Sequence, residues 1–397
     1  MPVVVLHAAL GALSIFRTLG YLGVEVHCVT NDKKAFALKS RYCRKSHFFA
    51  YDMEPPARLV EMLLDLAREF RTRPILIATS DETSIIVANH FDEISGAYLI
   101  AQNSGPIVRE LADKMSMFDL AMRHGVPVPR TILPGNEQEA RRHAAEVNYP
   151  VMLKGAMGNR LHERTGKKMV VVHNADELIE QYLELEDPEQ PNLMIQELIP
   201  GGDDQVYIFN GYFDANSDCR AAFTGRKIRQ FPVHVGCASL GECCWVQEVA
   251  DITIAFMKEI GYRGILDIGY RKDPRDGTYK VLDINPRVGQ AFRLFVAEDN
   301  LDVVRALYLD QTGQAFPDKV VPREGRRWLI EDFDFISSYH YWQEGALSLM
   351  PWIRSFRRVE EGCWFAWKDP VPFVFMVGRL LGQAVRWGRN RLTRRAH

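Results

Sequence analysis

The N-terminal part of the chain alternates between short apolar runs and segments whose apolar residues recur at helical spacing. Residues 3–6 and 75–78 are apolar runs of the length typical of buried strands, and residues 24–29 are expected to form a further strand. Residues 11–21 and 58–70 place their apolar side chains on one face of a helix. Strands that alternate with helices in this way predict a parallel sheet with helical crossovers.

The pattern changes near Asp113, where a second unit is expected to begin. Residues 150–154, 169–172 and 193–196 have the composition of strands, and residues 175–185 have that of an amphipathic helix. The spacing of these segments no longer follows the strand–helix rhythm of the N-terminal part. We therefore expect a separate lobe of mixed strands and helices.

A third region is rich in β-branched and aromatic residues, which is typical of antiparallel strands. The dipeptides Asn210-Gly211 and Asp276-Gly277 predict hairpin turns, and a helix is expected over residues 249–260. After residue 313 the composition shifts again. Six of the seven tryptophans lie there: Trp328, Trp342, Trp352, Trp364, Trp367 and Trp387.

The composition is that of an ordinary globular protein, with 47% hydrophobic and 25% charged residues in 397. A net charge of −2 gives no general attraction to nucleic acid. The seven cysteines include no C-x-x-C pair, which favours reduced thiols over disulfides or a zinc site. The N-terminus lacks the basic region of a signal peptide, and no apolar run approaches the roughly 18 residues of a membrane span. We expect a soluble, cytoplasmic protein.

Two acidic residues flank the second predicted turn and are candidates for metal binding. The turn at Asp276-Gly277 would bring Asp267 and Asp283 onto paired strands. Asn285 lies two residues after Asp283 and therefore on the same face. Oxygen ligands suit a hard cation such as Mg²⁺, which often accompanies substrate phosphates, and Arg287 could neutralise an oxyanion there. A solvated hairpin with its carboxylates on the wet face is the alternative.

Four motifs in one order make the sequence resemble the ATP-grasp superfamily, especially its carboxylate–amine ligases. The motifs are Asp113-Lys114 with Gly125-Val-Pro-Val-Pro129, the strand ending in Lys154, the hinge Gln196-Glu-Leu-Ile-Pro-Gly201, and Asp283-Ile-Asn-Pro-Arg287. The resemblance spans about residues 1–313. It implies a Rossmann-like domain over 1–112, a first lobe over 113–195, a second lobe with the metal site over 196–318, and a tryptophan-rich extension over 319–397. The fold class is then α/β together with α+β.

The resemblance also assigns roles to single residues. It implies a nucleotide site formed by Lys114, Lys154, Gln196, Glu197, Leu198 and Asp204. The lysines would reach the phosphates, the hinge would meet the adenine, and Asp204 would bind the ribose hydroxyls. Asp267, Asp283 and Asn285 would hold one or two Mg²⁺ ions, with Mn²⁺ as the alternative, and Arg287 would stabilise the transferring phosphoryl group.

The sequence departs from the family pattern in two places. Aspartate stands at both acidic metal positions, where family members often have glutamate. The phosphate-binding loop is poor in glycine and basic, so Arg160, Lys167 or Lys168 could replace backbone amides with charge. Exposed loop charge explains these three residues equally well.

Recognition of the second substrate is expected on the run Arg226-Lys227-Ile228-Arg229. On a strand, Lys227 and Arg229 would share one face and Arg226 the other. We favour Arg226 and Lys227 as catalytic residues, whereas a charged edge strand is the alternative. His234 and Arg293 are weaker candidates, and Cys237 is expected to be a packing residue.

The C-terminal residues 373–397 predict a basic amphipathic helix. Phe373, Met376, Val377 and Leu380 would form its apolar stripe, and six arginines without any acidic residue lie between positions 371 and 397. Such a helix could lie on the anionic inner face of a membrane, and the acceptor substrate would then be lipid-linked. Packing of the stripe on the body of the protein is the alternative.

Together these observations predict an ATP-dependent ligase that activates a carboxylate as an acyl phosphate and joins it to an amine. The partners would be small-molecule carboxylates and amines, without nucleic acid, and the resemblance implies a homodimer. An inactive ATP-binding scaffold and a carboxylase or carbamoylase that uses carboxyphosphate are the alternatives.

Overall fold

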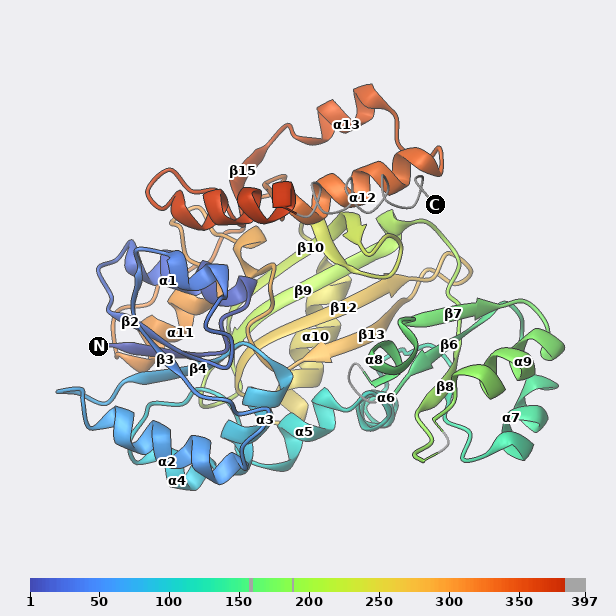
Figure 1. Ribbon diagram of the computed structural model, residues 1–397, viewed down its shortest axis with the longest axis horizontal. Coiled ribbons are helices and arrows are strands. Elements are labelled where there is room, and N and C mark those ends of the chain that lie inside the picture. Colours follow the sequence, from blue (N-terminus) through green and yellow to red (C-terminus); the bar gives the residue numbers. More distant parts are fainter. Residues whose placement is uncertain (157–159, 188, 383–397) are drawn as a thin grey trace, which may run out of the picture.

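The computed structural model describes residues 1–156, 160–187 and 189–382, which form three sheets with helices on their faces (Figure 1). The N-terminal sheet has the strand order β3-β2-β1-β4 and is parallel throughout. Its strands and helices are β1 (Val3–Leu6), β2 (Val26–Thr30), β3 (Cys43–Phe48), β4 (Ile75–Ala78), α1 (Leu10–Gly20), α2 (Pro56–Ala67), α3 (Asp81–Asn89), α4 (Phe91–Ser95) and α5 (Pro106–Ala112), with a 3-10 turn η1 (Phe36–Lys39). The predicted parallel sheet is thereby confirmed.

The second sheet is antiparallel, with the order β5-β8-β6-β7. It comprises β5 (Thr131–Ile132), β6 (Val151–Gly155), β7 (Met169–Val172) and β8 (Leu193–Glu197), with helices α6 (Lys114–Arg123), α7 (Glu137–Ala144), α8 (Arg160–Thr165) and α9 (Ala175–Leu185). Leu153 and Ile195 pack with α7 and α9 on one face of this sheet. Because side chains alternate along a strand, Lys154 and Gln196 point to the other face, where they line a cavity.

The third sheet has seven strands in the order β13-β12-β9-β10-β11-β14-β15. All neighbours in it are antiparallel except β14 and β15. Its elements are β9 (Val206–Phe213), β10 (Cys219–Phe231), β11 (Cys237–Cys243), β12 (Gly264–Lys272), β13 (Tyr279–Asn285), β14 (Arg327–Leu329), β15 (Val359–Gly362), α10 (Gln247–Glu259), α11 (Val303–Gln311), α12 (Glu331–Gln343) and α13 (Leu349–Ser355), with 3-10 turns η2 (Asp203–Gln205) and η3 (Phe292–Leu294).

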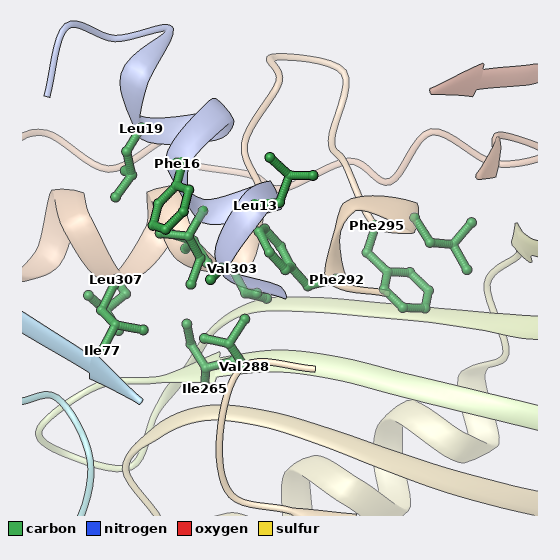
Figure 2. Packing of buried hydrophobic residues seen from close by; sticks show 14 of the residues in the cluster. Leu13, Phe16, Leu19, Ile77, Ile265, Val288, Phe292, Phe295, Val303 and Leu307 are labelled. Carbon is green, nitrogen blue, oxygen red and sulfur yellow. The ribbon is translucent and has the colours of Figure 1, made fainter. Parts of the chain in front are cut away.

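The largest apolar core joins the N-terminal domain to the third sheet. Helix α1 contributes Leu13, Phe16 and Leu19, which pack against η3 and α11 (Figure 2). Ile77 of β4 and Ile265 of β12 belong to the same cluster, so strands from two sheets share one core. Helix α10 packs in a second cluster on the other face of the third sheet. This shared core fixes the hairpin of β12 and β13 relative to the N-terminal domain. The hairpin carries Asp267, Asp283 and Asn285 and is called the acidic hairpin below.

The C-terminal segment packs on the body of the protein as far as it is described. Residues 371–382 are helical, and Phe373, Met376, Val377 and Leu380 join the largest core. Up to this point the structure favours the packing alternative over the membrane-facing helix. The remaining tail, residues 383–397, lies outside the described residues. Among the described helices, none combines the length and the apolar character that crossing a bilayer requires.

One predicted turn is wrong. Asn210-Gly211 lies inside β9, and the chain turns instead after Asp214, where Ser217 has a φ of 61°. Gly211 is needed for packing, because a Cβ there would overlap the Phe209 ring. The other turn is confirmed: Gly277 has a φ of 79° between β12 and β13. All seven cysteines are free, as expected.

Candidate active site

A cavity of about 830 Å³ lies between the second and third sheets. Strands β6 and β8 and the hinge after β8 form one wall, and strands β9, β10, β12 and β13 form the other. Ten of the main residues expected in the site line it: Lys114, Lys154, Gln196, Glu197, Leu198, Lys227, Asp267, Asp283, Asn285 and Arg287. Arg226 and Asp204 are not among the lining residues.

The acidic hairpin places three oxygen-bearing side chains together. Asp267 on β12 is directly opposite Asn285 on β13, and Gly269 is opposite Asp283. The Asn285 amide donates to Asp283 Oδ2 at 2.9 Å and to the backbone oxygen of Asp267 at 3.3 Å. The antiparallel register set by the Asp276-Gly277 turn therefore brings the two carboxylates and the amide to one face of the sheet.

Two glycines leave room for these carboxylates. A Cβ on Gly269 would lie well inside van der Waals contact with Asp283 Oδ1, and one on Gly289 would overlap Asp267 Oδ2. Backbone without a side chain thus lies directly against each acid. This arrangement accommodates the short aspartate side chains close to the sheet.

Asp267 is partly buried, and one of its polar neighbours is a residue that sequence reasoning missed. Burial and the nearby Asp283 raise the pKa of Asp267 to about 6. Asn210 of β9 donates to Asp267 Oδ2 at 3.3 Å, while its own Oδ1 is buried without a hydrogen-bond partner. The sequence signal at Asn210-Gly211 was interpreted as a turn, which hid this polar contact.

The candidate metal ligands at the acidic hairpin are all oxygen donors. In the described part of the chain, no group of three or more His, Cys, Asp or Glu side chains could hold a metal. The set at the hairpin is instead two carboxylates and an amide, Asp267, Asp283 and Asn285. Oxygen donors of this kind fit Mg²⁺, which keeps several waters and takes further ligands from substrate phosphates.

Two lysines face the acidic hairpin across the cavity. Lys114 begins α6 and donates to the backbone oxygen of Gly155 at 2.8 Å. Burial and the neighbouring charge of Lys154 lower the pKa of Lys114 to about 8. Burial also lowers the pKa of Lys154, with Lys227 acting in the same direction. Two desolvated ammonium groups close together indicate a site that binds anions.

The hinge residues are held by different interactions. Gln196 is buried and donates to Thr131 Oγ1 at 2.9 Å. Glu197 is ion-paired with Arg275 and with Lys280, the latter at 3.3 Å. Burial opposes ionisation of Glu197, but the hydrogen bonds from Arg275 and from the backbone of Arg130, together with Lys280, outweigh it and lower the pKa of the carboxyl. Leu198 follows and lines the cavity.

Of the two aspartates after the hinge, Asp203 rather than Asp204 lines the cavity. Asp203 Oδ1 accepts from Gln230 Nε2 at 3.0 Å. Asp204 accepts a bond from the neighbouring Gln205 at 3.2 Å. The motif alone does not distinguish these adjacent acids.

The basic run on β10 divides among three environments. Lys227 lines the cavity and donates to the backbone oxygen of Gly236 at 2.8 Å. Arg226 is ion-paired with Glu242 at 2.6 Å, and Arg229 is buried in a bidentate pair with Asp334 at 2.8 Å. The expectation that Lys227 and Arg229 share a face is wrong, because a β-bulge between them breaks the alternation.

Arg287 connects the acidic hairpin to the N-terminal domain. Its guanidinium donates to Asn285 Oδ1 at 3.1 Å and to Asp81 Oδ1 at 2.5 Å. Asp81 follows β4 at the carboxyl edge of the parallel sheet. The N-cap of α3 is Ser80, which accepts from Thr83 N. Asp81 is therefore used for the ion pair with Arg287 rather than for the cap.

The remaining candidates lie in three different environments. Lys168, His234 and Cys237 line the cavity. Arg160 and Lys167 are paired with acids of the first lobe, Asp187 at 2.6 Å and Glu184 at 3.1 Å respectively. Arg293 is buried between Asp302 and Glu361, at 2.6 and 2.7 Å, away from the cavity.

The chain is similar in sequence to two enzymes, although no model of a known protein family matches it. Over 277 residues the chain is 24% identical to D-aspartate ligase of Enterococcus faecium, covering 66% of this chain and 64% of that protein. Over 245 residues it is 23% identical to the carbamoyl phosphate synthase large chain of Deinococcus radiodurans, covering 58% and 22%. The chain thus spans less than two thirds of either relative.

Solved structures show the same fold at lower identity. The biotin carboxylase domain of Hydrogenobacter thermophilus 2-oxoglutarate carboxylase, in complex with MgADP, ADP and bicarbonate, has a TM-score of 0.61 at 17% identity, covering 82% of this chain and 73% of that one. The N5-carboxyaminoimidazole synthetase of Staphylococcus aureus in complex with ADP has a TM-score of 0.62 at 12% identity, covering 82% and 80%. The chain therefore has the ATP-grasp fold, and its sequence relatives are of the carboxylate–amine ligase type.

Proposed function

We propose that the protein is an ATP-dependent ligase that activates a carboxylate and joins it to an amine. The observation that carries the proposal is the convergence, in one cavity, of the acidic hairpin with Lys114 and Lys154. Anion-binding ammonium groups on one wall and hard oxygen donors on the other suit a nucleoside triphosphate with its metal.

Each wall of the cavity then has its own task. Lys114 and Lys154 bind the nucleotide phosphates, the hinge residues Gln196 to Leu198 contact the base, and Asp204 or the adjacent Asp203 accepts from the ribose. Asp267, Asp283 and Asn285 would hold Mg²⁺, which when bound supplies charge neutralisation of the phosphates. The protein contributes positioning and electrostatic stabilisation rather than a covalent intermediate.

The reaction has two steps. The substrate carboxylate attacks the γ-phosphorus of ATP, forming an acyl phosphate and breaking the bond to ADP. The amine then attacks the acyl carbon, forming an amide, while phosphate leaves and the amine loses a proton. Arg287 and Lys227 lie where they can neutralise the transferring phosphoryl group. Since Arg226 is engaged by Glu242, the geometry favours Lys227 for direct contact.

A carboxyphosphate route is the second candidate, because one structural neighbour is described in complex with bicarbonate. Bicarbonate would then take the place of the organic carboxylate in the first step. Both routes release ADP, and they differ in the carboxylate on which ADP release depends.

An ADP-release assay tests the proposal. The full-length protein is incubated with ATP and Mg²⁺ across a matrix of amino acids and small carboxylates, with bicarbonate as one member. ADP release that depends on a particular carboxylate and amine is expected, and Asp283→Asn should abolish it. Asp251→Asn is the matched control, because Asp251 lies on α10 and, among the described residues, its side chain accepts only from the Gln247 side chain. Release that is independent of every added pair and unaffected by Asp283→Asn would contradict the proposal.

A further inference from the structure

A cluster of polar side chains joins helix α12 (Glu331–Gln343) to the cavity wall. Asp203 Oδ2 accepts from the Tyr341 hydroxyl at 2.5 Å and lies 3.0 Å from His234 Nδ1. Its other oxygen, Oδ1, accepts from Gln230 Nε2 at 3.0 Å. Asp203, Gln230 and His234 all line the cavity, whereas Tyr341 lies behind them and is 6% exposed.

The Tyr341 hydroxyl has contacts to three separate segments of the chain. Besides donating to Asp203 in η2, it accepts from the backbone N–H of Gln230 at 3.3 Å and of His234 at 3.4 Å. Gln230 belongs to β10, and His234 lies in the loop between β10 and β11. One hydroxyl group can make about three hydrogen bonds, so each of its positions is used. Phenylalanine could fill the same space but would make none of them.

His234 depends on the same contacts. Its φ of 65° lies in the left-handed region, which is unfavourable for a residue with a side chain and persists only where the surroundings enforce it. Its Nε2 lies 2.9 Å from Glu344 Oε2, next to the end of α12, and its ring packs edge-on against Tyr341. Burial opposes protonation, but bonds to Glu344 and Asp203 outweigh it and raise the pKa of the imidazole.

We propose that Tyr341 is a positioning residue of the cleft, which acts through Asp203 and His234. Through Asp203 it fixes the end of the hinge, whose residues 198–202 line the cavity. Through His234 it fixes the loop 232–236, whose residues 234–236 line the cavity on the β10 side. Helix α12 thus supports the cavity wall from behind. The consequence for ligand binding rests on the proposed function, because it requires nucleotide in this cavity.

Hydrogen–deuterium exchange of the full-length protein tests the connection without any ligand. Tyr341→Phe should increase exchange in two segments that are distant in sequence, residues 200–206 and 231–237. Tyr339→Phe is the matched control: Tyr339 lies on the same helix and is 51% exposed, and within the described part of the chain its hydroxyl accepts only from Gln343. Asp203→Asn weakens the same cluster at its hinge residue and should increase exchange in the same two segments. The test therefore does not depend on the folding of one variant.

Titration with ADP and Mg²⁺ tests the consequence for the site. At a temperature where each variant is folded, Tyr341→Phe should raise the Kd for MgADP by about tenfold, whereas Tyr339→Phe leaves it unchanged. A purely structural role would lower the melting temperature without changing this Kd.

The outcomes separate the inference from the proposed function. Unchanged exchange in either segment would overturn the inference, and so would increased exchange with an unchanged MgADP affinity. If the wild-type protein fails to bind MgADP, the proposed function is wrong. The exchange result alone then decides whether Tyr341 positions the cavity wall.

Discussion

At the scale of single residues, the site contains acidic residues that the sequence predicts and neighbouring residues that the sequence does not predict. The motif around Asp283 and Asn285 is contiguous, so its chemistry is visible in the chain itself. Asn210 and Tyr341 reach the site through strand pairing and helix packing across 57 and 138 residues, measured to Asp267 and Asp203. No local pattern encodes such contacts, and they could be identified only from the structure.

The glycines opposite the two acids give a prediction that involves no change of charge. Gly269→Ala and Gly289→Ala should each weaken Mg²⁺-dependent ADP binding by about tenfold, because the new Cβ displaces the Asp283 or Asp267 carboxylate. Calorimetric titration of ADP with and without Mg²⁺ measures the effect. Gly96→Ala is the control, since a Cβ there meets nothing within 4 Å. Equal Mg²⁺-dependent binding by all three variants would contradict this account of the acids.

Lys114 gives a prediction on pH. Its pKa is lowered to about 8, so the ammonium group is charged below this pH and neutral above it. Attraction to the nucleotide phosphates is therefore present below pH 8 and lost as the pH rises through that value. We expect MgADP affinity to fall between pH 7 and 9 in the wild-type protein, at most about tenfold per pH unit. The Lys114→Arg variant keeps its positive charge up to pH 9, so its MgADP affinity should fall less over this range. If the variant and the wild-type protein show the same pH dependence of MgADP affinity, Lys114 does not bind the phosphates.

At the scale of elements, apolar pattern and turn chemistry located most strands and helices. The ranges 3–6, 75–78, 169–172 and 175–185 match β1, β4, β7 and α9 residue for residue. Polar edge strands were missed: β3 has the sequence CRKSHF and is largely exposed, so it carries no apolar signal. The bulge in β10 was also not predictable, because it arises from pairing with β11.

The loop before β7 gives a prediction that compares adjacent lysines. Lys168 lines the cavity, whereas Lys167 is paired with Glu184 at 3.1 Å on the outside of the lobe. Lys168→Ala should weaken MgATP binding several-fold through the loss of one cation near the phosphates. Lys167→Ala should leave it unchanged, because an exposed ion pair contributes little. Fluorescence titration measures both, and an equal effect of the two changes would contradict the assignment.

At the scale of the whole molecule, the C-terminal segment is built into the fold. Strands β14 and β15 extend the third sheet, and the buried Arg17 of α1 is paired with Asp369 at 3.0 Å. Arg17 also donates to the backbone oxygens of Cys363 and Trp364, both at 2.7 Å. The tryptophan-rich composition indicates that a different region begins after residue 313. It does not indicate which parts of the chain this region contacts, because the contacts join opposite ends of the chain.

The measurement that tests the central claim most directly is the affinity for ADP with and without Mg²⁺. Titration calorimetry compares the wild-type protein with Asp283→Asn and with the control Asp251→Asn. We expect Mg²⁺ to strengthen ADP binding in the wild-type and control proteins and to have no effect on Asp283→Asn. If the wild-type protein binds no ADP, or if Asp283→Asn retains the full Mg²⁺ effect, the cavity between the second and third sheets is not the metal–nucleotide site proposed here.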